Sequence, residues 1–153
     1  MSADNLEEQL KVTRIIYVAL VSGQLILFMI ALILVENNIV EPNLDLDELF
    51  KFLIPAIGFV AMVMSHRIYI YKISNLKMDI ELVAKLVKYR NYKITQWAMT
   101  EFASIISLVG LLTTGNYLYA IVFLFLIGFF ILNRPSEQQF KLDFRVSEEY
   151  SEI

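Results

Sequence analysis

Long apolar blocks alternate with charged segments along this chain. A helix needs about 20 mostly apolar residues to cross the hydrocarbon core of a bilayer. The blocks near residues 15–35 and 94–114 have this length. The block near 50–71 has it if Lys51 and Arg67 extend from its two ends to the membrane surfaces. The block near 117–132 is shorter and must borrow flanking residues.

Apolar side chains surround each block instead of forming a stripe, which is typical of helices immersed in lipid. Hydrophobic residues make up 58% of the 153 positions, whereas soluble domains have roughly 45–50%. The pattern predicts an all-α membrane protein, an antiparallel bundle of four transmembrane helices with long helices extending into the cytoplasm. Residues 1–153 form one membrane domain, with 72–93 as a cytoplasmic helical hairpin segment and 135–153 as a cytoplasmic tail.

Charged residues distinguish the two ends of the predicted bundle. Lys and Arg residues occur in the N-terminal flank, in the segment between the second and third spans and in the tail, whereas the loop between the first and second spans is acidic. By the positive-inside rule, both termini and the middle segment are cytoplasmic, in a multi-pass protein of the cell inner (plasma) membrane. The basic residues are Lys11, Arg14, Arg67, Lys72, Lys77, Lys85, Lys88, Arg90, Lys93, Arg134, Lys141 and Arg145.

The segments outside the blocks carry helix signals of their own. "MDIELVAKLVKYRNYK" has apolar residues at helical spacing, which predicts one long helix that continues into the third span. Gly115 suits the position just after that helix. Pro135 predicts a short helix start, with Phe140 and Phe144 turned toward lipid. Aromatic residues near the block ends predict interfacial belts, made of Tyr17, Tyr69, Tyr71 and Trp97 inside and Phe50, Phe52, Tyr117 and Tyr119 outside.

Glu101 is the most unusual polar residue, because it lies within the third block. Charged groups in spans are rare and usually face a bundle interior or a water-filled cavity. Glu101 lies four residues beyond Trp97, which is about 6 Å deeper along the helix, and His66 and Arg67 are at similar depth. A contact with one of them is geometrically allowed if the second and third spans are neighbours. We expect a structural carboxyl that reaches the inner interface or contacts a neighbouring helix, and we keep a proton, ion or substrate site, and then a catalytic acid, as alternatives.

Small and polar residues in the other blocks predict packing seams. Ser22 and Gln24 lie in the middle of the first block, about 200° apart around the helix, so they face different neighbours. We expect them to form hydrogen bonds between helices. Small residues let helices approach closely, and we interpret three stripes as seams rather than a conduction path. They are Ala19 and Gly23; Gly58, Ala61 and Ser65; and Thr100, Ala103, Ser104, Ser107 and Gly110.

Several kinds of chemistry have no support in the residue types. The chain has no cysteine and one histidine, so disulfides, thiolate chemistry and Cys- or His-rich metal or haem sites are not expected. No phosphate-binding glycine loop, HExxH or GxSxG is present. The acidic "DLDELF" lacks the spacing of a calcium loop, so we expect a solvated loop rather than a cation site. We predict no enzyme activity, cofactor, metal site or nucleic-acid partner.

The second half of the chain resembles an uncharacterised family of small four-span bacterial membrane proteins. The resemblance rests on Tyr89-Arg90, on Ala98 and Glu101, on Thr114-Gly115-Asn116 and on Arg134-Pro135, and it covers about residues 10–150. "IIYVALVSGQLILF" is similar to the family's first span. Phe102 stands where relatives tend to have glycine, which argues against a tight helix approach there. The resemblance implies the fold and no established activity.

These observations favour one function and leave a second open. We expect a non-enzymatic membrane component or subunit, in contact with the lipid bilayer and with a second copy or another membrane protein. The alternative is a small ion- or proton-coupled transporter or channel that uses Glu101. The candidate intramembrane polar residues are Glu101, His66, Arg67, Ser22, Gln24 and Ser104.

Overall fold

The computed structural model describes residues 3–39, 41–76 and 80–146, with side chains from residue 10 onward. All regular secondary structure in this part is helical, which confirms the predicted all-α class. The helices are α1 (Ala3–Glu36), α2 (Leu44–Ser74), α3 (Leu82–Thr114), α4 (Leu118–Leu132) and α5 (Glu137–Asp143). The basic segment before the third block continues into it as one helix, as predicted. Residues 77–79 and 147–153, which include Lys77, lie outside the described part.

Three of these helices, α1, α2 and α3, are long and apolar enough to cross a membrane. A fourth crossing is counted only if α4 and α5, which meet at 70°, form one bent span. The 15 residues of α4 extend about 22 Å at 1.5 Å per residue, against a hydrocarbon core of about 30 Å. The flanking residues therefore do not lengthen α4 as expected, because the chain turns after Leu132.

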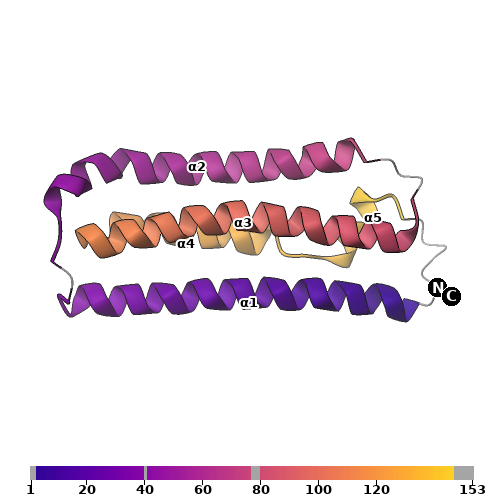
Figure 1. Ribbon diagram of the computed structural model, residues 1–153, viewed down its shortest axis with the longest axis horizontal. Helices are drawn as coiled ribbons and strands as arrows, with labels where there is room; N and C mark the ends of the chain where they lie inside the picture. Colours follow the sequence, from indigo (N-terminus) through magenta and orange to yellow (C-terminus); the bar gives the residue numbers. More distant parts are fainter. Residues whose placement is uncertain (1–2, 40, 77–79, 147–153) are drawn as a thin grey trace.

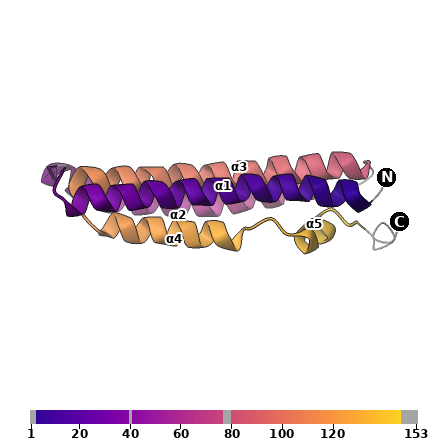
Figure 2. The same cartoon turned by 90° about the horizontal axis from the view of Figure 1, so that it is seen from below.

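The helices α3 and α4 form a central pair, with α1 on one side and α2 on the other (Figure 1). The helices α1 and α3 run in one direction, and α2 and α4 run in the opposite direction. Seen from below, α4 and α5 lie on one face of the molecule (Figure 2). We name the end where α1 begins and α5 lies the proximal end, and the end with the α3–α4 turn the distal end.

The turns that reverse the chain at the distal end have local causes. Gly115 ends α3 in the left-handed conformation, with φ of 66°, and its N–H donates to Leu111 O at 2.9 Å, as its position predicted. The Asn43 side chain accepts from Leu46 N and caps the start of α2. The Asn43 N–H donates to Thr113 O at 2.9 Å. This bond attaches the α1–α2 connection to the end of α3.

Two of the three predicted small-residue stripes form seams. Gly58, Ala61 and Ser65 of α2 are buried, as is the stripe on α3 from Thr100 to Gly110. The prediction for the first helix is wrong, because Ala19 and Gly23 are exposed. The inward face of α1 includes the larger side chains of Gln24 and Phe28 instead, together with Ala31. Phe28 stacks on Phe123 of α4, with ring centroids 4.6 Å apart.

The short helix α5 packs into the bundle and does not turn its aromatic side toward lipid. Phe140 and Phe144 have no exposed surface, which overturns the prediction for the tail. They form a cluster with Tyr69 of α2, Tyr89 of α3 and Leu10 of α1. The chain bends by 70° between α4 and α5 and continues toward the proximal end, where the apolar side of α5 meets α2 and α3 (Figure 2).

Three residues predicted for the aromatic belts lie inside the bundle instead. Trp97, Tyr69 and Tyr119 are 1%, 5% and 0% exposed, respectively. Tyr71 and Phe52 do face outward. Aromatic residues serve both at membrane interfaces and in cores, and composition alone does not separate the two uses.

A side chain at Gly110 would force Ile54 of α2 and Tyr119 of α4 to move. A methyl group there would lie 2.4 Å from Ile54 Cδ1 and 3.1 Å from Tyr119 Cγ, whereas at Gly58 the nearest atom would be an ordinary 3.5 Å away. We therefore expect Gly110→Ala to lower the free energy of unfolding by about 1–3 kcal/mol. The matched Gly58→Ala should be neutral or stabilising. Thermal unfolding in detergent measures both, and equal melting temperatures would contradict this packing.

Candidate functional site

Glu101 lies half-buried at the border of the buried face of α3. Four residues before it, Trp97 contacts Tyr17 of α1, with ring centroids 5.3 Å apart. Two residues after it, Ala103 packs in a cluster with Ala61 of α2. Positions two apart on a helix point about 200° away from each other. Glu101 is therefore on the side of α3 that faces α1 and away from α2.

His66 and Arg67 do not meet Glu101. Both are exposed on α2. The ion pairs among the described residues are Lys51–Asp47 and Lys141–Glu137, so Glu101 forms none. Equal depth along the spans is therefore not enough to predict a contact of Glu101 with His66 or Arg67, because α2 and α3 point these side chains in different directions.

Gln24 is a buried polar residue of α1, as is Thr13, and Ser22 is exposed, so Gln24 and Ser22 face different ways as expected. Gln24 is 2% exposed, and neither its Nε2 nor its Oε1 has a hydrogen-bond partner in the described part of the chain. Ser107 Oγ on α3 is also buried and has no hydrogen-bond partner among the described residues. The expected hydrogen bond from Gln24 to a neighbouring helix is thus not formed.

The register of α1 and α3 places Gln24 and Ser104 at the same level along the bundle. Tyr17 and Trp97 are in contact, and the two helices run in the same direction. Seven residues, or two turns, further along are Gln24 on α1 and Ser104 on α3. Ser104 Oγ donates to Thr100 O at 3.0 Å, within its own helix. A hydroxyl that bonds its own backbone in this way no longer offers its hydrogen to the oxygen of a neighbouring amide.

A buried lysine occupies the proximal end of the bundle. Lys93 has no exposed surface. Its Nζ is 4.5 Å from the ring centre of Tyr69 and 5.9 Å from that of Tyr89, and it is 3.4 Å from Gln96 Oε1. The faces of aromatic rings attract a cation. Tyr69 OH donates to Asp143 Oδ2 at 2.5 Å and so links α2 to α5 beside this lysine.

The connection between α4 and α5 is held by side chains of α3. Trp97 Nε1 donates to Asn133 O at 3.2 Å, and Gln96 Nε2 donates to Asn133 Oδ1 at 3.1 Å. Tyr89 OH donates to Ser136 O and accepts from Ser136 N, at 3.3 and 3.2 Å. Three of these bonds satisfy backbone groups of Asn133 and Ser136 after the end of α4, where the helix itself has no partner for them.

A second polar cluster closes the distal end. Asp47, which is 8% exposed, accepts from Tyr119 OH at 2.8 Å and from Asn116 Nδ2 at 3.0 Å. Lys51 Nζ is 3.0 Å from its other oxygen. The expectation of a solvated acidic loop is therefore wrong for Asp47, which lies in α2 and joins that helix to the α3–α4 turn.

The spacing of residues along α3 contains a signal for the buried lysine. Tyr89, Lys93, Gln96, Thr100 and Ser104 follow one another at intervals of three or four residues. That spacing places them on one face of a helix. The charge pattern predicts for Lys93 only a role in setting the topology, because lysines are almost never fully buried without a partner. The aromatic rings around its ammonium group are those of Tyr89, four residues earlier on α3, and of Tyr69 on α2. Only the first of these neighbours follows from spacing along one helix.

The described side chains support contacts between helices more than chemistry. No three His, Asp or Glu residues among them gather where they could hold a metal ion. Asp47, Asp143 and Glu36 each accept a hydrogen bond from a tyrosine on another part of the bundle, and so hold separate helices together. Glu101, Gln24 and Ser107 are the polar groups whose surroundings leave a further role open.

Comparison with protein families, curated proteins and solved structures finds no match for this chain. The resemblance to small four-span bacterial membrane proteins therefore stays a prediction. The residue that departs from that pattern, Phe102, is 63% exposed, so its ring does not keep α3 from its neighbours.

We expect Asp47→Ala to destabilise the protein far more than Asp45→Ala. Removing the Asp47 carboxylate leaves the Tyr119 hydroxyl and the Asn116 amide with lost partners, and such a loss costs about 1–3 kcal/mol for each buried group. Asp45 is exposed in the same first turn of α2 and provides the matched control. Melting temperatures in detergent measure the difference, and similar values for the two variants would exclude the distal cluster as a stabilising contact.

Proposed function

We propose that this protein is a non-enzymatic, multi-pass component of the inner (plasma) membrane, built as an antiparallel four-span bundle. One observation supports this most strongly, namely the unequal burial of the spans. In the most apolar stretch of α3, 50% of the residues are buried inside the bundle. In those of α2 and α1, only 22% and 11% of the residues are buried. The bundle thus surrounds α3 and leaves most of the apolar surface of α1 and α2 uncovered.

The uncovered surfaces are made of large apolar side chains. On α1, Ile26, Met29 and Ile33 are more than half exposed. On α2, Phe52 and Phe59 are 81% and 64% exposed. Apolar surface of this extent is stable in lipid or against another membrane protein, but not in water. The two surfaces flank the central α3–α4 pair on opposite sides, so a second copy or a partner subunit has two separate places to bind.

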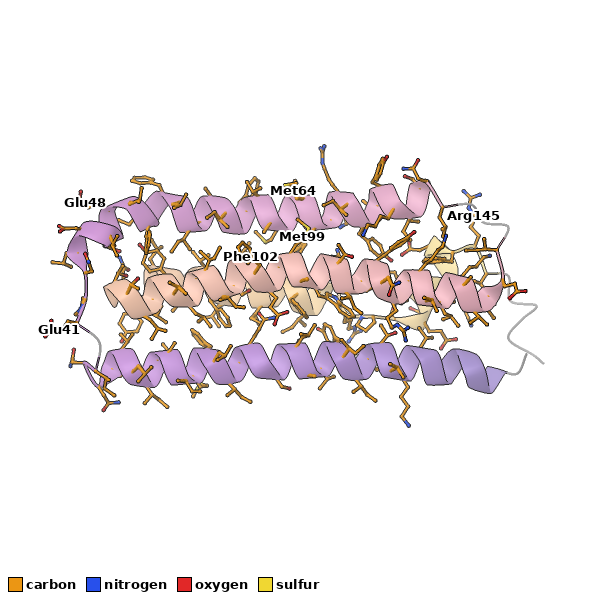
Figure 3. All side chains as sticks on the ribbon, viewed as in Figure 1. Glu41, Glu48, Met64, Met99, Phe102 and Arg145 are labelled. Atoms are coloured by element: carbon orange, nitrogen blue, oxygen red, sulfur yellow. The ribbon has the colours of Figure 1, made fainter. Side chains whose placement is uncertain are left out.

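The polarity of the two ends supports the orientation. Glu41 and Glu48 lie at the distal end, and Arg145 lies at the proximal end (Figure 3). Basic residues in the first part of α1, in the last turn of α2 and in the first turns of α3 lie toward the proximal end as well. The positive-inside rule then places the proximal end in the cytoplasm. The short α4 crosses if the bilayer thins locally around it, which costs fractions of a kcal/mol per Å.

The interior of the bundle favours a structural component over a conduit. The ring of Tyr17 packs against both Trp97 and Phe130, at 5.3 and 5.5 Å. Further toward the distal end, Phe28 stacks on Phe123. Aromatic contacts between α1 and the central pair thus close the interior at two levels, and they stabilise the packing.

The second candidate is a small ion- or proton-coupled transporter or channel. It is favoured by Gln24 and Ser107, whose buried polar atoms have no partner in the described residues, and by Glu101, which forms no ion pair there. Intramembrane polar groups of this kind are often functional. In this alternative, Glu101 carries the exchangeable proton and Gln24 lies on its path.

The orientation can be tested directly because the chain has no cysteine. Single-cysteine variants Glu48→Cys at the distal end and Ser74→Cys at the end of α2 are both at exposed positions. We expect a membrane-impermeant maleimide to label Glu48→Cys on intact cells and Ser74→Cys only after permeabilisation. Labelling of Ser74→Cys on intact cells would reverse the proposed orientation.

The two functions differ in their response to Glu101→Gln. For a structural component, this variant should fold with an unchanged or slightly altered melting temperature and cause no change in ion or proton flux across proteoliposomes. For a transporter, it should abolish a flux that the parent protein shows. Glu48→Gln, at an exposed distal position, is the matched control, and a flux lost in Glu101→Gln alone would replace the first proposal with the second.

A further inference from the structure

A hollow opens at the proximal end between α1 and the α4–α5 connection. Its volume is about 410 Å³, within the roughly 300–1,000 Å³ of typical ligand sites. Arg14, Tyr17 and Val18 line it from α1. The segment from Arg134 to Gln138 lines it from the other side. Residues some 120 positions apart in the chain thus form one site that the sequence does not reveal.

Two guanidinium groups give this hollow a positive character. Neither Arg14 nor Arg134 forms an ion pair among the described residues. The carboxylate that lines the hollow, that of Glu137, is 2.9 Å from Lys141 Nζ and is thereby balanced. A guanidinium binds a phosphate through two parallel hydrogen bonds, which favours arginine at phosphate sites.

The position of the hollow identifies the source of the phosphate. Arg14 immediately precedes the apolar block of α1, and Arg134 follows α4 by two residues. Both therefore lie where a span meets the headgroup region. Val18 in the lining is exposed, and so are Ile15 and Leu132, which are close in the chain to Arg14 and Arg134, so a molecule held there would have a phosphate end and a hydrocarbon end.

We propose that this hollow binds the phosphate headgroup of an anionic phospholipid, with Arg14 and Arg134 on the phosphate and the acyl chains along α1 and α4. Basic pockets between transmembrane helices on the cytoplasmic side bind such headgroups. The bound lipid would bridge α1 to the α4–α5 connection, which Trp97 and Gln96 already hold on the other side. The lipid would thus attach α1 to the central pair. This inference rests on the membrane placement proposed above.

The test measures lipid adducts on the full-length protein in detergent by native mass spectrometry, with short-chain phosphatidylglycerol, phosphatidylcholine and inorganic phosphate as probes. We expect phosphatidylglycerol to bind in preference to phosphatidylcholine. At about 1 kcal/mol for each arginine, the double variant Arg14→Gln/Arg134→Gln should weaken phosphatidylglycerol binding roughly thirtyfold. Arg67→Gln, which removes an exposed arginine outside the hollow, should leave it unchanged.

Several outcomes would overturn the proposal. Equal affinity of the double variant and Arg67→Gln would show that the hollow does not hold the lipid. Competition by millimolar inorganic phosphate with no preference for phosphatidylglycerol would identify a site for a free anion. Should the double variant fail to fold, Arg134→Lys, which keeps the charge but loses the paired hydrogen bonds, takes its place and should bind more weakly than the parent. Because these measurements are made in detergent, a failed lipid site and a failed cysteine-labelling pattern are distinguishable.

Discussion

Helices that are apolar all round have no preferred inward face in lipid, because hydrocarbon surrounds an exposed leucine as well as a neighbouring helix does. The face of α3 supplies that preference here. Its small and hydroxyl side chains, from Thr100 to Gly110, let α2 come close enough for Ile54 to contact Gly110. Its larger residues, such as Trp97, receive Tyr17 of α1 and Phe130 of α4. Each of the other long helices is positioned by its contact with α3.

Polar side chains complete this arrangement at both ends, where helix termini leave backbone groups without partners. At the distal end, Asp47 joins α2 to Asn116 and Tyr119 beyond the end of α3. At the proximal end, Trp97 and Tyr89 hold the connection that leads to α5. In the middle of the bundle, by contrast, Gln24 and Ser107 are buried, and their polar side-chain atoms have no hydrogen-bond partner among the described residues. Packing therefore positions the spans, and hydrogen bonds position the ends.

Much of the fold could be predicted, because it follows from local rules. Apolar length predicts helices that span a membrane, and Gly115 predicts the end of α3 through its left-handed conformation. The inward faces of α2 and α3 followed from small residues at helical spacing. The same reasoning failed for α1, where Ala19 and Gly23 are exposed, because a small residue permits a close approach but does not require one.

The candidate site was less predictable, because it depends on helix rotation. Depth along a span can be counted from the sequence, and Glu101 does lie one turn beyond Trp97. Which neighbour it faces depends on which helix lies beside that part of α3, and α1 occupies the side where His66 and Arg67 of α2 were expected. The burial of Lys93 depends likewise on Tyr69 of α2, 24 residues away in the chain.

The sequence by itself determined that the chain is helical, where its long helices run, and that the acidic stretch from Glu36 to Glu48 carries no basic residue. These are properties of local composition and of the spacing of residues along a helix. Only the tertiary structure decided that α3 and α4 are central, that α5 turns its phenylalanines inward, and that Arg14 and Arg134 share one hollow. The physical reason is that contacts between helices depend on the mutual rotation of surfaces that are almost equally apolar, and small differences in side-chain shape decide among such packings.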